Sequence, residues 1–114
     1  MSYQGSCHCG QIRFEVQGTI DSVMECNCSH CSRKGYLLWF VPRSQFTLLT
    51  PDAPLATYTF NKHVIQHHLC PTCGCAPFGF GANKGAEMAA INVRCLEGVD
   101  LASVNRKAVD GRSY

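Results

Sequence analysis

The stretch CPTCGC, residues 70–75, decides how this sequence folds. Two cysteines separated by two residues can sit on one tight turn, where their sulfur atoms reach the spacing of about 4 Å that two ligands of one zinc ion need. Pro71 lies inside the turn and Gly74 follows it, as a zinc knuckle requires. Cys70 and Cys73 therefore form a strong half-site, which needs a partner elsewhere in the chain.

The stretch CHCG, residues 7–10, supplies that partner. Alternate residues of a strand share a face, but their Cα atoms lie about 6.6 Å apart. Cys7 and Cys9 therefore need a bend to meet one metal, and Gly10 allows it. The two half-sites predict a structural zinc site that staples a small β domain, with the ligands Cys7, Cys9, Cys70 and Cys73. The alternative is one iron–sulfur centre shared by all clusters, but paired knuckles favour tetrahedral zinc.

A third cluster, CNCSHC at residues 26–31, brings together Cys26, Cys28 and Cys31. These three thiolates predict a second zinc ion, so we expect two Zn²⁺ per chain. If no fourth protein ligand exists, the metal keeps an open position, which is the arrangement of a catalytic zinc. A second closed, structural site is the alternative.

The candidates for a fourth ligand of this second metal are His8, His30, Cys75 and Cys95. His30 is adjacent to Cys31, and neighbouring residues rarely point at the same metal. Cys75 follows a ligand of the first site by two residues, so that site could attract it instead. Cys95 alternates with apolar residues in AAINVRCL and is interpreted as a core residue. Elimination favours the open site.

The composition excludes several classes of protein. The chain has 114 residues, which we interpret as one zinc-binding domain over residues 1–114. With 16% charged and 46% hydrophobic residues it is not disordered. The net charge of +2 is small and the basic residues are scattered, so neither nucleic acid nor a membrane is an expected partner.

Cysteine usage bears on the compartment. The N-terminus has no basic region followed by an apolar run, and the longest apolar run, residues 36–41, is too short to span a membrane. We therefore expect a cytoplasmic protein. An odd count of nine cysteines in a reducing compartment indicates metal ligands and not a disulfide scaffold.

Periodicity predicts a mainly β fold of short strands. In QIRFEV, residues 11–16, apolar and charged residues alternate as in a half-buried strand, whereas GYLLWFVP, residues 35–42, predicts a more fully buried one. The other expected strands are residues 44–50, 57–60, 63–70 and 89–96. Asn61 and Lys62 are the expected turn of a hairpin, residues 79–87 (GFGANKGAE) a glycine-rich loop, and residues 101–104 a possible turn of helix.

The ordered motifs CHCGQIRFEV, CNCSHCSRKG, HHLCPTCGCAPFGFG and NVRCLEGVDL resemble the glutathione-dependent formaldehyde-activating enzyme family, whose domain also occurs in centromere protein V. The resemblance runs from about Ser6 to Asp100. It implies an Mss4-like, or β-tent, fold. By this similarity the four-cysteine set matches the structural zinc ligands, and Cys26, Cys28 and Cys31 match the three-thiolate catalytic zinc.

The resemblance also implies an activity. The family is named for condensing formaldehyde with glutathione to S-hydroxymethylglutathione, and it is classed with the carbon–sulfur lyases. Glutathione, or another small thiol, and a small aldehyde are therefore the expected partners. The alternatives are a zinc-stabilised binding module without catalysis and a thiol or metal sensor.

Further residues could support such a reaction. His30, His67 and His68 are acid–base candidates by type, although hydrogen-bonded strand histidines are commoner. Arg33 and Lys34 could attract a carboxylate of the ligand, or be solvated charges. Three aromatic residues could wall a pocket but are more often core: Trp39, Phe40 and Phe78.

Overall fold

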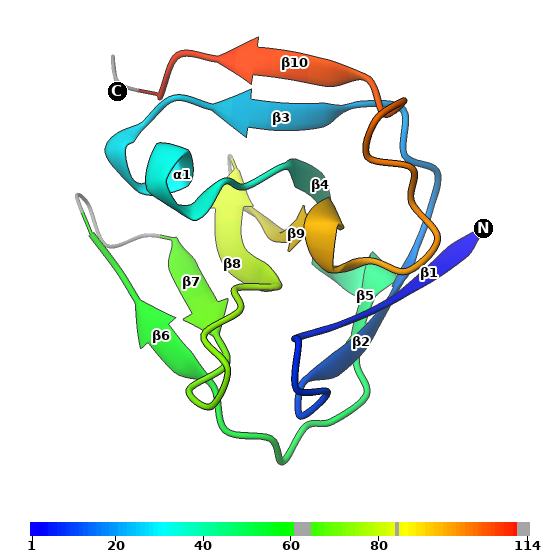
Figure 1. Ribbon diagram of the computed structural model, residues 1–114, viewed down its shortest axis with the longest axis vertical. Coiled ribbons are helices and arrows are strands. Elements are labelled where there is room, and N and C mark those ends of the chain that lie inside the picture. The colour runs from blue at the N-terminus through cyan, green and yellow to red at the C-terminus, as the bar shows by residue number, and fades with distance from the viewer. Residues whose placement is uncertain (61–64, 84, 112–114) are drawn as a thin grey trace.

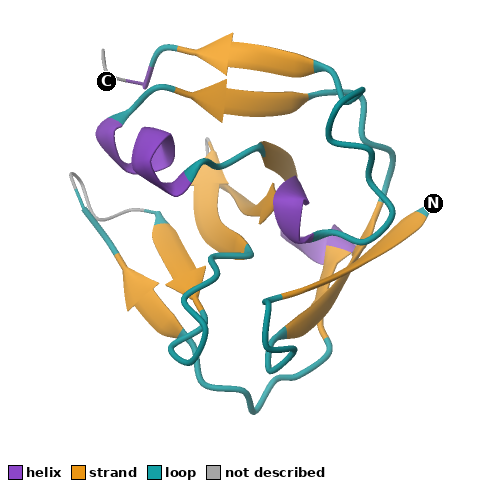
Figure 2. Ribbon diagram, viewed as in Figure 1, coloured by secondary structure: helices purple, strands orange, loops and turns teal. Residues whose placement is uncertain are grey.

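The part of the chain that the structure describes forms two β-sheets and one short α-helix (Figures 1 and 2). The structure is a computed structural model that describes residues 1–60, 65–83 and 85–111. The strands are β1 (Ser2–Ser6), β2 (Arg13–Gln17), β3 (Val23–Cys26), β4 (Leu38–Pro42), β5 (Phe46–Leu48), β6 (Ala56–Tyr58), β7 (Gln66–Leu69), β8 (Phe78–Asn83), β9 (Ala86–Asn92) and β10 (Arg106–Val109). The helices are α1 (Ser29–Lys34) and two 3-10 turns, η1 (Arg43–Gln45) and η2 (Val93–Cys95).

The smaller sheet has the order β1-β2-β5, and all its pairs are antiparallel. Its central strand confirms the predicted alternation: Ile12, Phe14 and Val16 are fully buried, while Arg13 is exposed. This pattern arises because one face of the sheet packs on the core and the other meets water.

The larger sheet has the order β10-β3-β4-β9-β8-β7-β6. All its pairs are antiparallel except β10 with β3, which run parallel in register from Arg106 opposite Val23 to Val109 opposite Cys26. The C-terminal strand, red in Figure 1, therefore ends beside the start of the CNCSHC segment. This pairing brings the end of the chain to the second cysteine cluster.

Three phenylalanine rings join the two sheets. Phe14 of β2 and Phe46 of β5 stack at a centroid distance of 5.6 Å, and the ring of Phe78 on β8 lies 5.4 and 4.7 Å from them. Buried aromatic rings contribute large apolar area and specific edge-to-face contacts. Trp39 and Phe78 are therefore core residues, as the sequence favoured, whereas Phe40 is 42% exposed.

Two expectations about strands are wrong. Strand β4 alternates between buried and exposed residues instead of being buried on both faces. The stretch expected as a glycine-rich loop, residues 79–87, is the hairpin of β8 and β9. Glycine occurs in β8 because a Cβ on Gly79 would lie 2.9 Å from the carbonyl oxygen of Gln66 on the neighbouring strand.

Of the remaining expectations, one is confirmed in part and another is wrong. Strands β6 and β7 pair antiparallel as expected, but Asn61 and Lys62 lie outside the described residues. Residues 101–104 form a turn, not a helix, held by the backbone N–H groups of Ser103 and Val104 donating to the carbonyl of Asp100. Strands β1, β3 and β10 and helix α1 were not predicted. No helix among the described residues is long and apolar enough to cross a membrane.

Candidate metal centres

The first cysteine cluster joins two loops that are far apart in sequence. Cys7 and Cys9 follow β1, and Cys70 and Cys73 follow β7; in Figure 1 these loops lie below the two sheets. The four Sγ atoms lie within 4.8 Å of one another, and the Sγ of Cys9 is 3.6 Å from Cys7 and 3.7 Å from Cys70. The structure thus brings together the four residues paired from their spacing, and this donor set suits tetrahedral zinc.

Both loops direct backbone N–H groups at sulfur. Ile12 donates to the Sγ of Cys7 at 3.3 Å, and Cys73 donates to the Sγ of Cys70 at 3.5 Å. Gly10 and Gly74 close the two turns with positive φ angles of 82° and 80°, a conformation that glycine adopts without strain. Such donors favour the thiolate, which is the form that binds metal.

The pKa values of two cysteines in this cluster reflect these donors. The backbone N–H of Cys73 lowers the pKa of the Cys70 thiol. The backbone N–H groups of Cys75 and Cys9 lower the pKa of Cys73 to about 5. These donors favour the thiolate forms of Cys70 and Cys73, whereas the neighbouring thiols of the cluster raise the pKa of Cys9.

Cys75 and Cys95 lie toward the first cluster. The backbone N–H of His8 donates to the sulfur of Cys75, and both cysteines pack against the main core. Burial, followed by the nearby Cys75, Cys7 and Cys73, raises the pKa of Cys95 to about 11. Cys95 is therefore a core-packed thiol, but it lies in η2 and not on the strand face expected, because β9 ends at Asn92.

The second cluster is built by a strand end and a helical turn. Cys26 ends β3, Cys28 caps α1 and Cys31 lies in its first turn. Their Sγ atoms lie within 4.8 Å of one another. The N–H of Cys28 donates to Cys26 Sγ at 3.4 Å, and that of Cys31 donates to Cys28 Sγ at 3.3 Å. Burial is the largest single influence on Cys28 and opposes its ionisation, but the hydrogen bonds from Cys31, Cys26 and His30 together outweigh it and lower the pKa of Cys28.

Among the described residues, no fourth Cys, His, Asp or Glu completes this second group. His8 and Cys75 belong to the surroundings of the first cluster, as the previous contacts show. The ring of His30 instead packs against His67, at a centroid distance of 4.3 Å. The two clusters therefore offer four and three sulfur ligands respectively, and each could hold a metal ion.

The C-terminal segment covers one side of the second cluster. The N–H of Asn27 donates to the carbonyl of Val109 at 3.0 Å, and its side-chain amide donates to Asp110 at 3.0 Å. A Cβ added to Gly111 would collide with Cys26 Sγ and lie 3.1 Å from Cys28 Cβ. Only a residue without a side chain therefore fits there. Sequence reasoning did not find this role, because only the fold places Gly111 beside Cys26.

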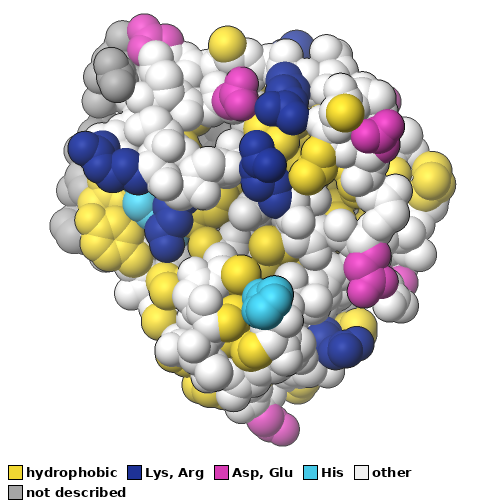
Figure 3. Space-filling model, viewed as in Figure 1, with side chains coloured by type: hydrophobic (Ala, Val, Ile, Leu, Met, Phe, Trp, Pro, Cys, Tyr) yellow, Lys and Arg dark blue, Asp and Glu magenta, His cyan; other side chains and the backbone are white. Residues whose placement is uncertain are grey.

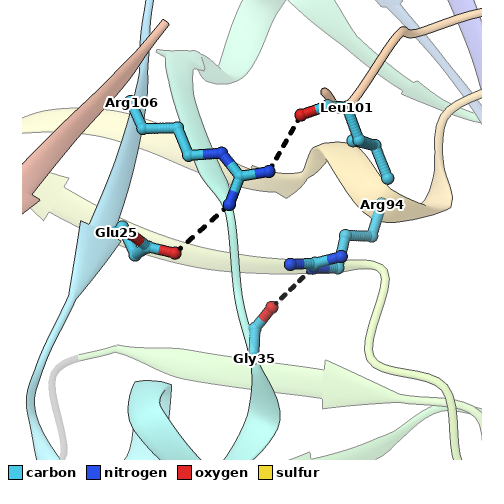
Figure 4. Close-up of polar contacts among 5 residues, drawn as sticks. All are labelled: Glu25, Gly35, Arg94, Leu101 and Arg106. Carbon is cyan, nitrogen blue, oxygen red and sulfur yellow. Dashed lines mark hydrogen bonds and ion pairs between the residues drawn. The ribbon is translucent and has the colours of Figure 1, made fainter. Parts of the chain in front are cut away.

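Two arginines hold the segments around this cluster (Figure 4). Arg106 of β10 donates to the carbonyl of Leu101 at 2.8 Å and pairs with Glu25 of β3 at 3.4 Å. Arg94 of η2 donates to the carbonyl of Gly35, the C-cap of α1, at 2.8 Å. These bonds fix β10 against β3, and η2 against the end of α1.

A cavity of about 630 Å³ adjoins the second cluster. It is lined by Ser29, His30, Arg33, Lys34, Tyr36, Tyr58, Phe60, His67 and Leu69. Tyr36 and Leu69 also pack in the cluster that contains Cys31, so they border both the cavity and the cysteines. In Figure 3 a histidine and basic side chains border hydrophobic surface over α1 and β6. Its volume is that of a small-molecule site.

The neighbouring histidines of β7, His67 and His68, lie in different environments. His67 lines the cavity, and burial, followed by the nearby His30, lowers its pKa to about 4. His68 is buried against Phe78 and Phe80, with its Nδ1 3.0 Å from the hydroxyl of Thr57. His68 therefore has a structural environment, whereas His67 and His30 face the cavity. Tyr36, Tyr58 and Phe60 were not identified from the sequence, because no spacing marks them.

The fold and the two cysteine groups define a class: a mainly β, Mss4-like protein with two clusters that could bind metal. The chain belongs to the glutathione-dependent formaldehyde-activating enzyme family, whose model matches residues 2–108. The family name implies an enzyme and suggests glutathione and formaldehyde as substrates. This match confirms the resemblance predicted from the cysteine motifs.

A solved structure is similar over nearly the whole chain. It is the crystal structure of a Rhodobacter sphaeroides protein from the Northeast Structural Genomics programme. The two sequences are 27% identical, the match covers 94% of this chain and 100% of the other, and the TM-score is 0.78. The arrangement of the two sheets is therefore shared with an experimentally determined structure.

Proposed function

We propose that residues 1–114 form one zinc-binding domain that holds two zinc ions and joins or separates an aldehyde and a thiol. The first zinc would be structural and bound by Cys7, Cys9, Cys70 and Cys73. The second would be bound by Cys26, Cys28 and Cys31 and would keep one position for a ligand. In both clusters the convergent sulfur atoms and the N–H donors directed at them support zinc, because thiolates are its preferred ligands.

A zinc ion with three thiolates and an open position favours binding of a further thiol as its thiolate. In the reaction, the S–H proton leaves and the sulfur lone pair forms a bond to the aldehyde carbon. The carbonyl π electrons move to oxygen, which takes up a proton to become a hydroxyl group. The reverse steps break the same carbon–sulfur bond, and no oxidant or reductant is required.

Residues of the chain would position the reactants and assist proton transfer. The cavity would hold a reactant near the second cluster, because its lining residues Tyr36 and Leu69 also pack with Cys31. His67 lines this cavity, and its ring is neutral at physiological pH because burial, followed by the nearby His30, lowers its pKa to about 4; a neutral ring nitrogen can accept a hydrogen bond from the thiol or the new hydroxyl group. We also propose a cytoplasmic location, because thiolate ligands persist in a reducing compartment.

One observation carries this proposal: three cysteine sulfurs converge without a fourth ligand among the described residues, and a cavity adjoins them. The test is the exchange rate between free formaldehyde plus glutathione and their adduct, measured by magnetisation-exchange NMR because the uncatalysed reaction also proceeds. The zinc-loaded protein should accelerate exchange, and Cys28→Ser should abolish the acceleration. Cys95→Ser, outside both clusters, is the control and should retain it.

The same experiment distinguishes the alternatives. Exchange no faster than in buffer, with both zinc ions bound and glutathione bound, would favour a binding module. Reversible loss of one zinc on mild oxidation, with the fold retained, would favour a thiol or metal sensor. Either result would contradict the proposed enzymatic function.

A further inference from the structure

The cavity beside the second cluster is lined mainly by ring side chains. The His30 ring lies at its centre, with centroid distances of 4.3 Å to His67, 5.0 Å to Phe60 and 5.4 Å to Tyr58. Tyr36 lies 5.6 Å from the same ring, on the side of the cysteines. Rings at these distances are in contact with one another, so a planar group would stack on their cavity-facing surface and not between them.

The charge of the cavity is confined to one edge. Arg33 and Lys34, both exposed and in the last turn of α1, line it, and no acidic residue is among its described lining residues. Arg33 Nη1 donates to the carbonyl of Ser29 at 2.8 Å, which holds the guanidinium along the helix. This edge suits a carboxylate, whereas the interior suits an uncharged ring.

The two substrates in the family name fit this lining poorly. Formaldehyde has two heavy atoms, far too few for a cavity of about 630 Å³. Glutathione is large enough, but it carries two carboxylates, an ammonium group and two peptide units. The basic edge can pair with its carboxylates, but glutathione has no ring to stack on the aromatic side chains that form most of the lining.

A further feature is the side chain of His30. Its Nδ1 atom is buried and has no hydrogen-bond partner among the described residues. Buried ring nitrogens are normally paired, but this atom has almost no accessible surface, so a molecule in the cavity would contact the ring of His30 and not its Nδ1.

We propose that this cavity binds the aldehyde substrate and that this substrate is an aromatic aldehyde with a carboxylate group. The ring would stack on the cavity-facing surface of Tyr58 and Phe60, with the carboxylate at Arg33 and Lys34. Its aldehyde carbon would then lie toward Tyr36 and Leu69, which border the cysteines. The reaction in this inference is the thiol addition described above, so it rests on the proposed function. The binding of the aldehyde in the cavity does not depend on that function.

The binding test uses benzoate, which has the ring and the carboxylate but neither a thiol nor an aldehyde. Its Kd for the zinc-loaded protein is measured by calorimetry. Tyr58→Ala should weaken binding about fivefold and Lys34→Gln about threefold. The matched controls are Phe40→Ala, a ring as exposed as Tyr58 but outside the cavity, and Lys107→Gln; both should leave the Kd unchanged.

The kinetic test compares 4-carboxybenzaldehyde with formaldehyde in adduct exchange with the same thiol. The zinc-loaded protein should favour the aromatic aldehyde, and Tyr58→Ala should lower that preference about fivefold. No benzoate binding, or a preference for formaldehyde, overturns the inference. The inference is also overturned if Tyr58→Ala weakens the binding of S-methylglutathione and leaves the binding of benzoate unchanged. The cavity would then bind the glutathione peptide and not the aldehyde.

The two proposals fail in different ways. If benzoate binds as expected but no thiol–aldehyde exchange is accelerated, the proposed function is wrong and the ligand class of the cavity still stands. If exchange is accelerated for formaldehyde and glutathione while benzoate does not bind, the proposed function stands and this inference is wrong.

Discussion

Single backbone N–H groups direct hydrogen bonds to the cysteine sulfurs in both clusters, yet the clusters differ in what they hold together. Cys7, Cys9, Cys70 and Cys73 join loops that follow strands of different sheets. Cys26, Cys28 and Cys31 lie within six residues of one another. A metal at the first cluster therefore closes a long loop of chain, whereas a metal at the second closes a short one.

We expect the two clusters to differ in their effect on stability. Cys73→Ser should unfold the protein, because structural zinc contributes on the order of 10 kcal/mol to small metal domains. Cys28→Ser should lose one zinc ion but shift the thermal transition by only a few degrees, roughly the effect of about 1 kcal/mol. Circular dichroism melting and zinc analysis measure both. Equal unfolding of the two variants would contradict the assignment of roles.

Gly111 gives a second prediction at the scale of a residue. Gly111→Ala should weaken zinc binding at the second cluster about tenfold, because the added Cβ collides with Cys26 Sγ and must displace the segment. Competition with a chromophoric chelator measures this affinity. Gly81→Ala is the control, since its added Cβ would make only an ordinary contact, at 3.4 Å, with the flexible side chain of Ile65. Equal zinc retention by Gly111→Ala and the unmodified protein would show that the segment does not position the cysteines.

At the scale of elements, β8 shows why glycine misled the sequence analysis. A run of glycines indicates a loop when only local propensity is considered. Here the neighbouring strand β7 approaches so closely that Gly79 has no room for a side chain, and the residues pair with both β7 and β9. This is a tertiary constraint, which a single sequence does not reveal.

This constraint predicts a difference between two glycines of one strand. Gly79→Ala should lower the free energy of unfolding by about 1–3 kcal/mol, because its Cβ would lie 2.9 Å from a backbone oxygen that cannot move freely. Gly81→Ala is the matched control, since its Cβ would meet the flexible side chain of Ile65 at 3.4 Å. Urea unfolding of the zinc-loaded variants measures both. Similar losses at the two positions would show that close approach is not the cause.

The sequence predicted the elements with strong local signals and missed the others. Alternation in QIRFEV predicted β2, and the paired β6 and β7 were expected. The strands β1, β3 and β10 are short and lack an alternating apolar pattern, and β10 gains its place by parallel pairing with β3. Helix α1 has only six residues and depends on the cap formed by Cys28, so no helical period marks it.

At the scale of the whole molecule, the cysteine motifs carried most of the information. Their spacing grouped four residues that the structure brings together across 61 positions of sequence, from Cys9 to Cys70. The cavity could not be predicted in this way. It is assembled from α1, β6, β7 and their flanks, and its rings come together only when the larger sheet is folded.

The stability of the whole protein should depend on pH through His67. Its pKa is about 4 in the folded protein and 6.5 as the reference value, so the unfolded chain binds more protons between these values. Stability due to this residue is therefore complete above about pH 6.5 and falls as the pH falls toward 4. His67→Gln should remove this part of the slope in urea unfolding. Parallel pH curves for the variant and the unmodified protein would contradict the assignment.

The central claim is that the second cluster holds a metal with one position open to a thiol. The direct measurement is the absorption spectrum of the protein with cobalt in place of both zinc ions, because tetrahedral cobalt absorbs according to its number of sulfur ligands. We predict that titration with glutathione changes the spectrum of one cobalt ion and leaves the other, bound by four cysteines, unchanged. A spectrum indifferent to glutathione and to simple thiols would show a closed site and contradict the account.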